Sequence, residues 1–436
     1  MDDGSFFGSP VTRLGSIMRE LNRVAVTGMG VISPVGNTLK EAWSALLAGR
    51  GAAAPITRFD CSEFKTRFAC EVKGFDPLKY LDAKEAKTMD LYTQYAMSAA
   101  AQAWDDAALN WCGCDRDPFR WGVIFASGIG GINTLQDELV KYARSGSAKP
   151  RFSPFMVPKM IANIAAGAIA VKYDLRGMNY ATVSACASSS HALIDAMNLI
   201  RLGKADVIIA GGSEAPINVT GVGGFGALRA LSERNDDPAT ASRPFDRDRD
   251  GFVLGEGAAA LIIESLDHAQ SRGARIYAEL CGGGMTADAF HSTLPHPDGT
   301  SVEKAMALAL DDAEINPEEI GYINLHATST PAGDGPEIGA VQRLFKNSLD
   351  TLHVSGTKSM TGHLLGGTGA LESAITVLSI HKGMIPPTIN TVNIDPVLDV
   401  RVDLTLGKAV EKNINAAMTN SFGFGGQNAT IVFKKI

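Results

Sequence analysis

The stretch TVSACASSSHALIDAMNLI, residues 182–200, joins two different patterns at one cysteine, Cys186. The residues that lead up to this cysteine, NYATVSAC at 179–186, predict a strand. Beyond the cysteine, apolar side chains recur at helical spacing and predict an amphipathic helix, whose start the serines at 188–190 are expected to cap. The apolar positions of that helix are Leu193, Ile194, Met197 and Ile200. A strand that turns directly into a helix is a building unit of α/β folds.

The same alternation of strand and helix patterns continues along most of the chain. Apolar β-rich runs lie at 23–32, 121–128, 205–212, 259–265, 276–285, 321–328, 352–359 and 416–435. Helical patterns lie at 91–107, 188–203, 300–313 and 367–383. Strands that alternate with helices predict α/β architecture with sheets covered on both faces.

Two segments of the chain share one layout. SACASSSHALIDAMNLIRLGKADV at 184–207 and GHLLGGTGALESAITVLSIHKGMI at 362–385 each contain a turn of small residues, an amphipathic helix and a basic last turn. Basic residues at that end favour a helix through its dipole. The echo predicts two similar, closely packed halves, which we place at 23–270 and 271–436.

Composition limits the class of protein. The chain has 436 residues, of which 45% are hydrophobic and 20% charged, as expected of a soluble globular protein. A formal net charge of −7 argues against a general nucleic-acid binder. The apolar runs all fall short of the roughly 18 residues that a membrane helix needs, so no membrane association is expected. The six cysteines form no C-x-x-C pair, which predicts free thiols, a reducing compartment and no metal site.

The first residues, 1–22, have no apolar core of the kind found in signal peptides and carry two aspartates near their start. We expect them to form a poorly ordered leader, either native or added. The remainder of the chain is therefore predicted to be cytoplasmic.

Cys186 has two interpretations. A free cysteine is usually a small buried hydrophobe. At a strand-to-helix turn, however, a cysteine projects from the backbone as nucleophiles do, and the helix dipole with its unpaired amides is expected to favour the thiolate. The small neighbours of Cys186 would also let a bulky substrate approach.

Two histidines supply partners for such a nucleophile. His326 follows the strand pattern GYINLH, and His363 lies with Lys358 in a turn before a helix. Both turns are rich in glycine and threonine and follow strands, where α/β folds gather their chemistry. The segment NSFGFGGQN at 420–428 surrounds Phe424 with glycines, so its amides could complete an oxyanion hole. A glycine-rich hairpin is the alternative interpretation of that segment.

These motifs together resemble the β-ketoacyl-[acyl carrier protein] synthases, the elongating condensing enzymes of type II fatty-acid synthesis. The resemblance runs from Arg23 to the C-terminus. It is carried by SACASS, GVGGFGALRALS, RPFDRDRDGFVLGEGA, HATSTPAGD, KSMTGHLLGGTGALES and NSFGFGGQN. It implies a thiolase-like fold, an αβαβα five-layer sandwich of two similar halves. It also implies a decarboxylative Claisen condensation between malonyl-carrier and an enzyme-bound acyl thioester.

The resemblance assigns roles by motif. Cys186 would accept the acyl chain, and His326 and His363 would promote decarboxylation of malonyl and stabilise the enolate. Lys358 would orient His363, with Glu372 as its ion-pair partner. The further roles are an oxyanion hole from the amides of Cys186 and Phe424, a gate from the Phe424 ring, and hydrogen bonds to the pantetheine arm from Thr328 and Thr330.

The family's substrates arrive on the phosphopantetheine of acyl carrier protein, and no other cofactor is implied. The resemblance also implies a homodimer, with Met156 reaching the partner's acyl pocket and setting chain length together with Ile129. The carrier is acidic, so a basic docking face is expected. Its candidate residues are Lys84, Lys87, Lys149 and Arg151.

Some features depart from the family pattern or mimic other motifs. Ala327 and Gln427 stand where glycine and threonine are common in the family. GVGGFG at 221–226 matches a dinucleotide motif but follows no long buried strand, so we predict a tight loop. DRDRDG at 246–251 mimics the start of a calcium loop, but position twelve is Gly257, so we expect ion pairs instead of calcium.

Three alternative functions remain open at this point. A thiolase would need a second cysteine near the C-terminus, and no cysteine follows residue 281. A cysteine hydrolase would leave His363 and Lys358 without a role. A non-catalytic chain-length subunit typically lacks the nucleophile, which is present here as Cys186.

Overall fold

The computed structural model describes residues 21–111, 116–146 and 149–436. The predicted leader, 1–22, lies outside the described residues except for its last two positions. The cysteines at 112 and 114 lie outside them as well.

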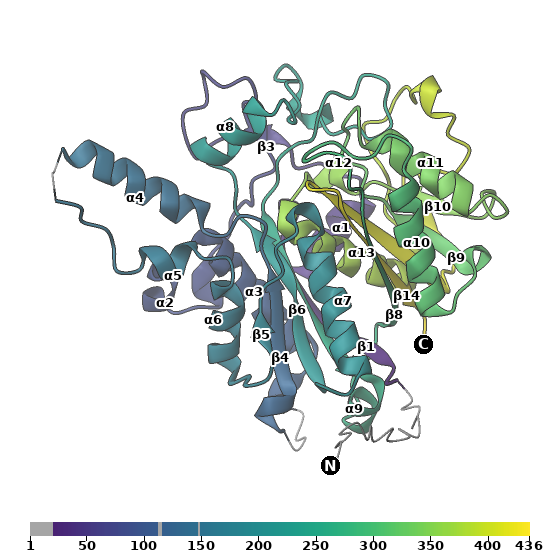
Figure 1. Ribbon diagram of the computed structural model, residues 1–436, viewed down its shortest axis with the longest axis horizontal. Coiled ribbons are helices and arrows are strands. Elements are labelled where there is room, and N and C mark those ends of the chain that lie inside the picture. Colours follow the sequence, from purple (N-terminus) through teal and green to yellow (C-terminus); the bar gives the residue numbers. More distant parts are fainter. Residues whose placement is uncertain (1–20, 112–115, 147–148) are drawn as a thin grey trace, which may run out of the picture.

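One ten-stranded mixed sheet runs through the molecule, in the order β10-β9-β13-β14-β8-β1-β7-β6-β4-β5 (Figure 1). The strands of its first half are β1 (Val24–Ile32), β4 (Trp121–Ala126), β5 (Asn179–Tyr180), β6 (Val207–Glu214) and β7 (Gly257–Ser265). The strands of its second half are β8 (Ala278–Ala287), β9 (Ile320–Asn324), β10 (His353–Ser355), β13 (Ala416–Gly423) and β14 (Gln427–Lys434). Antiparallel pairing of β1 with β8 joins the two halves.

Helices cover the sheet in layers. The principal helices are α3 (Leu91–Asp106), α6 (Ile164–Tyr173), α7 (Ser188–Arg201), α10 (Thr300–Ala313), α11 (Asp334–Leu344) and α13 (Thr368–Lys382). Shorter or peripheral helices are α1 (Leu39–Leu47), α2 (Ala83–Lys87), α4 (Ile132–Ser145), α5 (Met156–Met160), α8 (Val219–Ala227), α9 (Leu266–Ser271) and α12 (Lys358–Thr361). Two small two-stranded sheets pair β2 (Ala54–Pro55) with β3 (Phe68–Ala69) and β11 (Met384–Ile385) with β12 (Val410–Glu411).

Three apolar clusters define the layers. One outer cluster packs α3 and α6 against β4, β6 and β7. The central cluster packs α7 and α13 between strands of both halves. The second outer cluster packs α10 and α11 against β8, β9 and β14. The predicted α/β fold, with αβαβα layering in two similar halves, is confirmed.

The two segments that echo each other in sequence have the same local structure. A 3-10 turn, η4 (Ala185–Ala187), precedes α7, and a second, η7 (Leu365–Gly367), precedes α13. The first residue of each turn has a left-handed backbone, with φ 49° at Ala185 and φ 48° at Leu365. The second position of the turn is Cys186 in one half and Gly366 in the other, so one turn holds the thiol and its counterpart has no side chain.

Some local predictions were wrong. The predicted strand at 179–186 is a strand only at β5, because Ser184 and Ala185 turn the chain into η4. The predicted serine caps are absent, and the helix α7 has no side-chain cap. The three hydroxyls bond elsewhere: Ser188 to the Ala185 carbonyl, Ser189 to the Ala370 amide and Ser190 to Ser421. GVGGFG forms most of the helix α8 and is not a tight loop.

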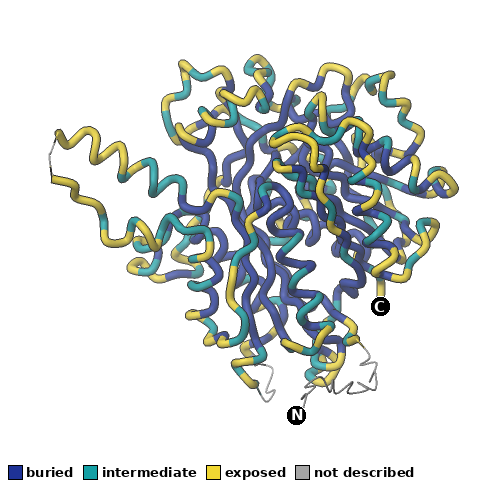
Figure 2. The backbone as a smooth tube through the Cα atoms, in the orientation of Figure 1, coloured by how far each residue is buried: buried dark blue, intermediate teal, exposed yellow. Residues whose placement is uncertain are grey.

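The pair α4 and α5 projects from the body of the molecule, at the left of Figures 1 and 2. The helix α4 has no buried residue, although it carries the apolar side chains Leu139, Val140 and Tyr142. Among the described residues, no helix has the length and apolar character required to cross a membrane.

Candidate active site

Cys186 lies at the floor of a cavity of about 350 Å³ between the two halves of the molecule. The turn η4 presents the thiol, which is 8% exposed, to this cavity. His326 and His363 line the same cavity. The fold therefore brings together the three residues that the sequence named as nucleophile and partners.

His363 is the direct partner of the cysteine. Its Nε2 lies 3.0 Å from Sγ of Cys186, and its Nδ1 lies 3.0 Å from the hydroxyl of Thr368. A hydroxyl can donate or accept, so Thr368 can support either neutral tautomer of the imidazole. When Nδ1–H donates to Thr368, Nε2 is free to accept the thiol proton.

His326 approaches the same point from the end of β9. Its ring meets that of His363 edge to face, with centroids 5.3 Å apart. Glu337 holds the turn below it, because its carboxylate accepts from the backbone amides of His326 and Ala327 at 2.7 Å each. Nδ1 of His326 is buried and has no hydrogen-bond partner in the described part of the chain.

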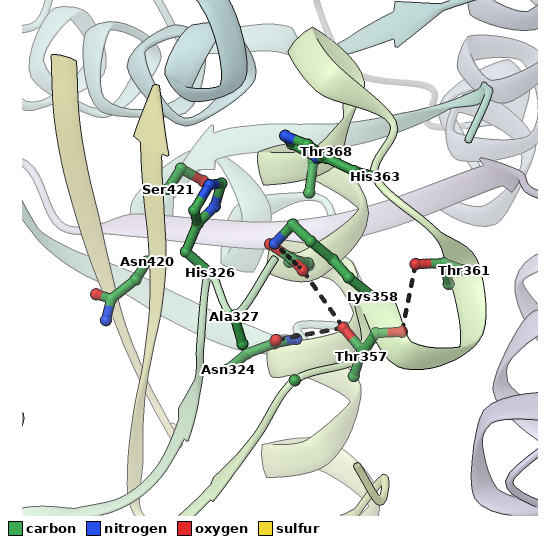
Figure 3. Close-up of polar contacts among 12 residues, drawn as sticks. Asn324, His326, Ala327, Thr357, Lys358, Thr361, His363, Thr368, Asn420 and Ser421 are labelled. Carbon is green, nitrogen blue, oxygen red and sulfur yellow. Dashed lines mark hydrogen bonds and ion pairs between the residues drawn. The ribbon is translucent and has the colours of Figure 1, made fainter. Parts of the chain in front are cut away.

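A buried ion pair lies beneath the histidines. Lys358 Nζ is 2.6 Å from Glu372 Oε1, and both side chains are 1% exposed. The hydroxyl of Thr357 bonds Asn324 and faces Glu372, and Figure 3 shows Lys358 lying among Thr357, His326 and His363. The predicted Lys358–Glu372 pair is therefore present, while the Nδ1 atom of His363 is held by Thr368 and not by Lys358.

Burial and charge set the protonation states of these groups. Burial raises the pKa of the Cys186 thiol to about 11, although the Lys358 charge and the Phe424 amide oppose that rise. Burial and then the Lys358 charge lower the pKa of His326 and of His363 well below the usual value. Near neutral pH the site thus holds a thiol and two neutral imidazoles. The predicted preference for a thiolate is not met, because desolvation outweighs the neighbouring positive charge and amides.

The loop around Phe424 closes one side of the cavity. This loop is the tip of the β13–β14 hairpin, as the alternative interpretation expected. It also lies beside the Cys186 thiol, where an oxyanion hole was expected. The backbone amides of Phe424 and Cys186 lie near the thiol sulfur and act to lower its pKa. Glycine at position 423 lets the hairpin backbone lie this close to Cys186, because a Cβ there would lie 3.0 Å from the Cys186 backbone nitrogen. Gln427 pairs with Gly423 at the first position of β14.

The cavity wall continues along the turn after His326. Thr328 and Thr330 line it, with their hydroxyls 3.1 Å apart. Between the histidine and these threonines, Ala327 is buried with φ 33°, a left-handed backbone that favours glycine. This conformation explains why glycine is common at the position, and the alanine leaves the hydroxyls in place.

Of the two predicted chain-length residues, Ile129 lines the cavity and Met156 does not. Met156 begins α5, on the projecting arm, and is partly buried there. Ile129 is 38% exposed, and its backbone amide donates to Glu214.

Glu214 is a fully buried carboxylate at the end of β6 that sequence analysis missed. Its Oε1 accepts from the hydroxyl of Ser127 at 2.8 Å and the amide of Ile129 at 3.1 Å. Its Oε2 accepts from the amides of Gly128 at 2.7 Å and Gly366 at 3.0 Å. One carboxylate thus ties the cavity wall at 128–129 to η7, which directly precedes Thr368.

The four docking candidates are exposed. Lys84 and Lys87 lie on α2, whose capping box is closed by Asp82 and Glu85. Lys149 and Arg151 lie between α4 and α5. All four thus lie outside the cavity, and none of them lines it.

Ion pairs hold the segment 246–251, but the expected pairing with the segment's own aspartates is met by Arg247 and not by Arg249. Arg249 binds Asp395 at 2.8 Å and donates to the Thr330 carbonyl at 3.2 Å, while Arg247 pairs with Asp248 at 3.7 Å. The main partner of Arg249 comes from outside the segment.

Glu214, Glu337 and Thr368 are the residues that sequence analysis overlooked. Thr368 stands inside the quoted motif KSMTGHLLGGTGALES, five positions after His363, and Glu214 ends the strand pattern that contains ADVIIAGG. The position of Glu214 at the end of a buried strand was the one sequence signal that could have indicated its role. Its hydrogen-bond partners could not be identified from the sequence, because they are distant from it along the chain.

The chain is similar to known proteins over most of its length. Residues 21–269 match the family described as Beta-ketoacyl synthase, N-terminal domain, and residues 277–392 match Beta-ketoacyl synthase, C-terminal domain. The 3-oxoacyl-[acyl-carrier-protein] synthase 2 of Synechocystis sp. is 48% identical, over 95% of this chain and 99% of that protein. The protein of the same name from Staphylococcus aureus strain N315 is 45% identical, over 96% and 99%.

Solved structures show the same fold. A β-ketoacyl synthase from Burkholderia phymatum matches with a TM-score of 0.87 and 34% identity, covering 95% of this chain and 100% of that one. A type II polyketide ketosynthase, solved in complex with its acyl-carrier protein, matches with a TM-score of 0.88 and 32% identity, over 96% and 100%. The chain therefore belongs to the β-ketoacyl synthase family.

Proposed function

We propose that this protein is a 3-oxoacyl-[acyl carrier protein] synthase that elongates an acyl chain by two carbons through decarboxylative condensation. One observation carries the proposal: Cys186 Sγ lies 3.0 Å from Nε2 of His363, in a cavity that His326 also faces. A cysteine hydrolase would leave one of the two histidines without a role. A thiolase would need a second cysteine near the C-terminus, and no cysteine follows residue 281.

In the first half-reaction the Cys186 thiol attacks the acyl thioester of the carrier. His363 Nε2 takes the thiol proton as the C–S bond forms, and the amides of Cys186 and Phe424 stabilise the oxyanion. The carrier thiolate leaves and takes the proton from His363. The acyl group then remains on Cys186 as a thioester.

In the second half-reaction malonyl-carrier occupies the cavity. Loss of CO₂ leaves an enolate, whose oxygen accepts hydrogen bonds from the neutral rings of His326 and His363. For this step His363 needs a proton on Nε2, which the Thr368 hydroxyl permits by donating to Nδ1. The enolate carbon attacks the acyl thioester, and the bond to Cys186 breaks as 3-oxoacyl-carrier forms. The departing Cys186 thiolate takes up one proton from solvent, which restores the thiol.

The carrier would approach over an exposed basic face. Lys84 and Lys87 on α2, with Lys149 and Arg151 nearer the arm, are proposed to meet its acidic surface. Thr328 and Thr330 would hydrogen-bond the pantetheine arm, and the Phe424 ring would gate its entry. The proposed reaction uses no other cofactor and takes place in the cytoplasm.

A homodimer is proposed from the edge of the sheet at β5, which has no further strand beside it among the described residues. The strand β5 ends the sheet with both of its residues exposed, and Val171 and Val183 beside it are 85% and 60% exposed. The arm adds the exposed side chains Phe155 and Val157. Apolar surface around a free strand edge is typical of an interface between copies, which would carry Met156 toward the partner's cavity.

Intact mass after mixing with acyl-carrier, followed by a malonyl-carrier chase, tests the function. The expected result is a mass gain of one acyl group on Cys186 that disappears as 3-oxoacyl-carrier accumulates. Absence of loading, or release of the acyl group as free acid, would contradict the proposal.

A further inference from the structure

The Cys186 sulfur and one ring nitrogen from each of His326 and His363 form a compact set of soft donor atoms. One such atom from each residue lies within 4.8 Å of the other two, and all three residues are buried. From this geometry we propose that the free protein binds one soft divalent cation, of the Zn²⁺ class, at Cys186, His326 and His363, and that the cation blocks the nucleophile.

The distances suit a tetrahedral ion. Zn–S bonds of about 2.3 Å and Zn–N bonds of about 2.0–2.1 Å place tetrahedral donors about 3.3–3.6 Å apart. The distance of 3.0 Å between Cys186 Sγ and His363 Nε2 lies just below that range. The upper bound of 4.8 Å on the distances among all three donor atoms lies above it. Small side-chain movements that slightly separate Cys186 from His363 and bring all three donors to tetrahedral spacing would complete the site, and the cavity leaves a fourth position for water.

The surroundings orient one of the two imidazole donors as protein metal sites do. The Nδ1 atom of His363 is hydrogen-bonded to Thr368, which fixes the ring. When Nδ1–H donates to that hydroxyl, the lone pair of Nε2 is available to a cation. The Nδ1 atom of His326 has no partner in the described chain, so no hydrogen bond restrains that ring through this atom.

The neighbouring charges are balanced. Lys358 disfavours a cation, but its ion pair with Glu372 offsets that charge, and the carboxyl groups of Glu214 and Glu337 also lie next to the site. Binding converts the Cys186 thiol to a thiolate, and its proton is released to solvent. No redox step is involved, and a chelator restores the thiol.

The donor set predicts which cations bind. Thiolate and imidazole ligands select Zn²⁺, Co²⁺ or Cd²⁺ over Mg²⁺, which requires oxygen ligands. An ion on Sγ would prevent attack on a thioester, so binding is expected to compete with acylation and alkylation of Cys186.

Cobalt titration of the reduced, full-length protein tests the site without relying on acyl transfer. The expected result is one equivalent of Co²⁺ per chain, with thiolate-to-cobalt absorption in the near ultraviolet that Zn²⁺ abolishes and Mg²⁺ does not. Protein alkylated at Cys186 by iodoacetamide, and the variant Cys186→Ala, should lack the absorption. Thr368→Val should weaken binding by about tenfold or more.

The sequence offers a matched control. The double variant Cys112→Ser plus Cys114→Ser removes the closely spaced thiols of WCGC and should bind Co²⁺ as the parent does. Three results would overturn the proposal. The absorption could persist in Cys186→Ala, it could be removed by the double variant alone, or the parent protein could show no absorption at all. If Cys186→Ala fails to fold, the alkylated parent protein still decides the question. Failure of the condensation assay would leave this cobalt signal unchanged, so the two proposals can fail separately.

Discussion

Cys186 and His363 form a hydrogen-bonded pair, with Sγ and Nε2 3.0 Å apart, although 177 positions separate them in the chain. His326 reaches the same cavity without a hydrogen bond to the sulfur among the described contacts. The two histidines are therefore expected to differ in their contribution to the two half-reactions.

The variant His363→Ala should lower acyl loading by about 10²–10⁴-fold, because it removes the acceptor of the thiol proton. His326→Ala should leave loading close to the parent rate and slow condensation by about 10²–10³-fold, as expected for loss of one enolate donor. Single-turnover intact mass, with and without malonyl-carrier, separates the steps. Equal slowing of loading by both substitutions would refute this division of roles.

Thr368 is predicted to position His363. In Thr368→Val the Nδ1 atom loses its buried partner, at a cost of about 1–3 kcal/mol, or about 5- to 160-fold in loading rate. Thr368→Ser keeps the hydroxyl and should restore most of that rate. If the serine variant is as slow as the valine variant, packing of the methyl group and not the hydroxyl is what matters.

Glu214 is predicted to hold the acyl pocket in shape. In Glu214→Gln the amide nitrogen replaces an oxygen that accepts two hydrogen bonds, and about 1–3 kcal/mol of stability is lost for each amide left unsatisfied. The expected result is a change in the ratio of kcat/KM for long and short acyl chains, since Ile129 loses its anchor. Ser127→Ala removes a single bond to the same carboxylate and should shift that ratio less. An unchanged ratio in both variants would contradict this role.

The pair Lys84→Glu plus Lys87→Glu should raise KM for carrier-bound substrates without changing stability, and the effect should shrink as salt is added. The control is Lys304→Glu plus Lys346→Glu, which alters net charge equally. Lys304 lies on α10 and Lys346 follows α11, across the molecule from α2 in Figure 1. A similar rise in KM for both pairs would point to net charge instead of a docking face.

The buried histidines predict a dependence of stability on pH. Their pKa values are lowered from 6.5, so below that pH the unfolded chain binds protons that the folded chain does not. The free energy of unfolding should therefore decrease as the pH is lowered. At one unit below 6.5 the expected loss is about 1.4 kcal/mol per histidine. The variant His326→Asn plus His363→Asn removes this contribution. Denaturation at about pH 7.5 and about pH 5.5 should show a smaller acid loss in the variant, and equal losses would exclude neutral buried histidines.

The sequence by itself determined the α/β class, the two similar halves and the residues that meet in the cavity. Alternating strand and helix periods are local properties, and they specify which faces must be buried. The echo between the segments around Cys186 and His363 survives in the structure as two turns with the same left-handed first residue. The ordered motifs sufficed to place Cys186, His326, His363 and the Lys358–Glu372 pair.

Only the tertiary structure decided how these groups are partnered and charged. The thiol stays protonated because packing buries it, and no local pattern reports the depth of burial. The serines after Cys186 do not cap α7, because the fold brings other chain segments to Ser189 and Ser190. The roles of Glu214 and Thr368 could be recognised only from their hydrogen-bond partners in the folded structure. Hydrogen bonds between distant segments depend on how whole layers pack, which the local sequence does not encode.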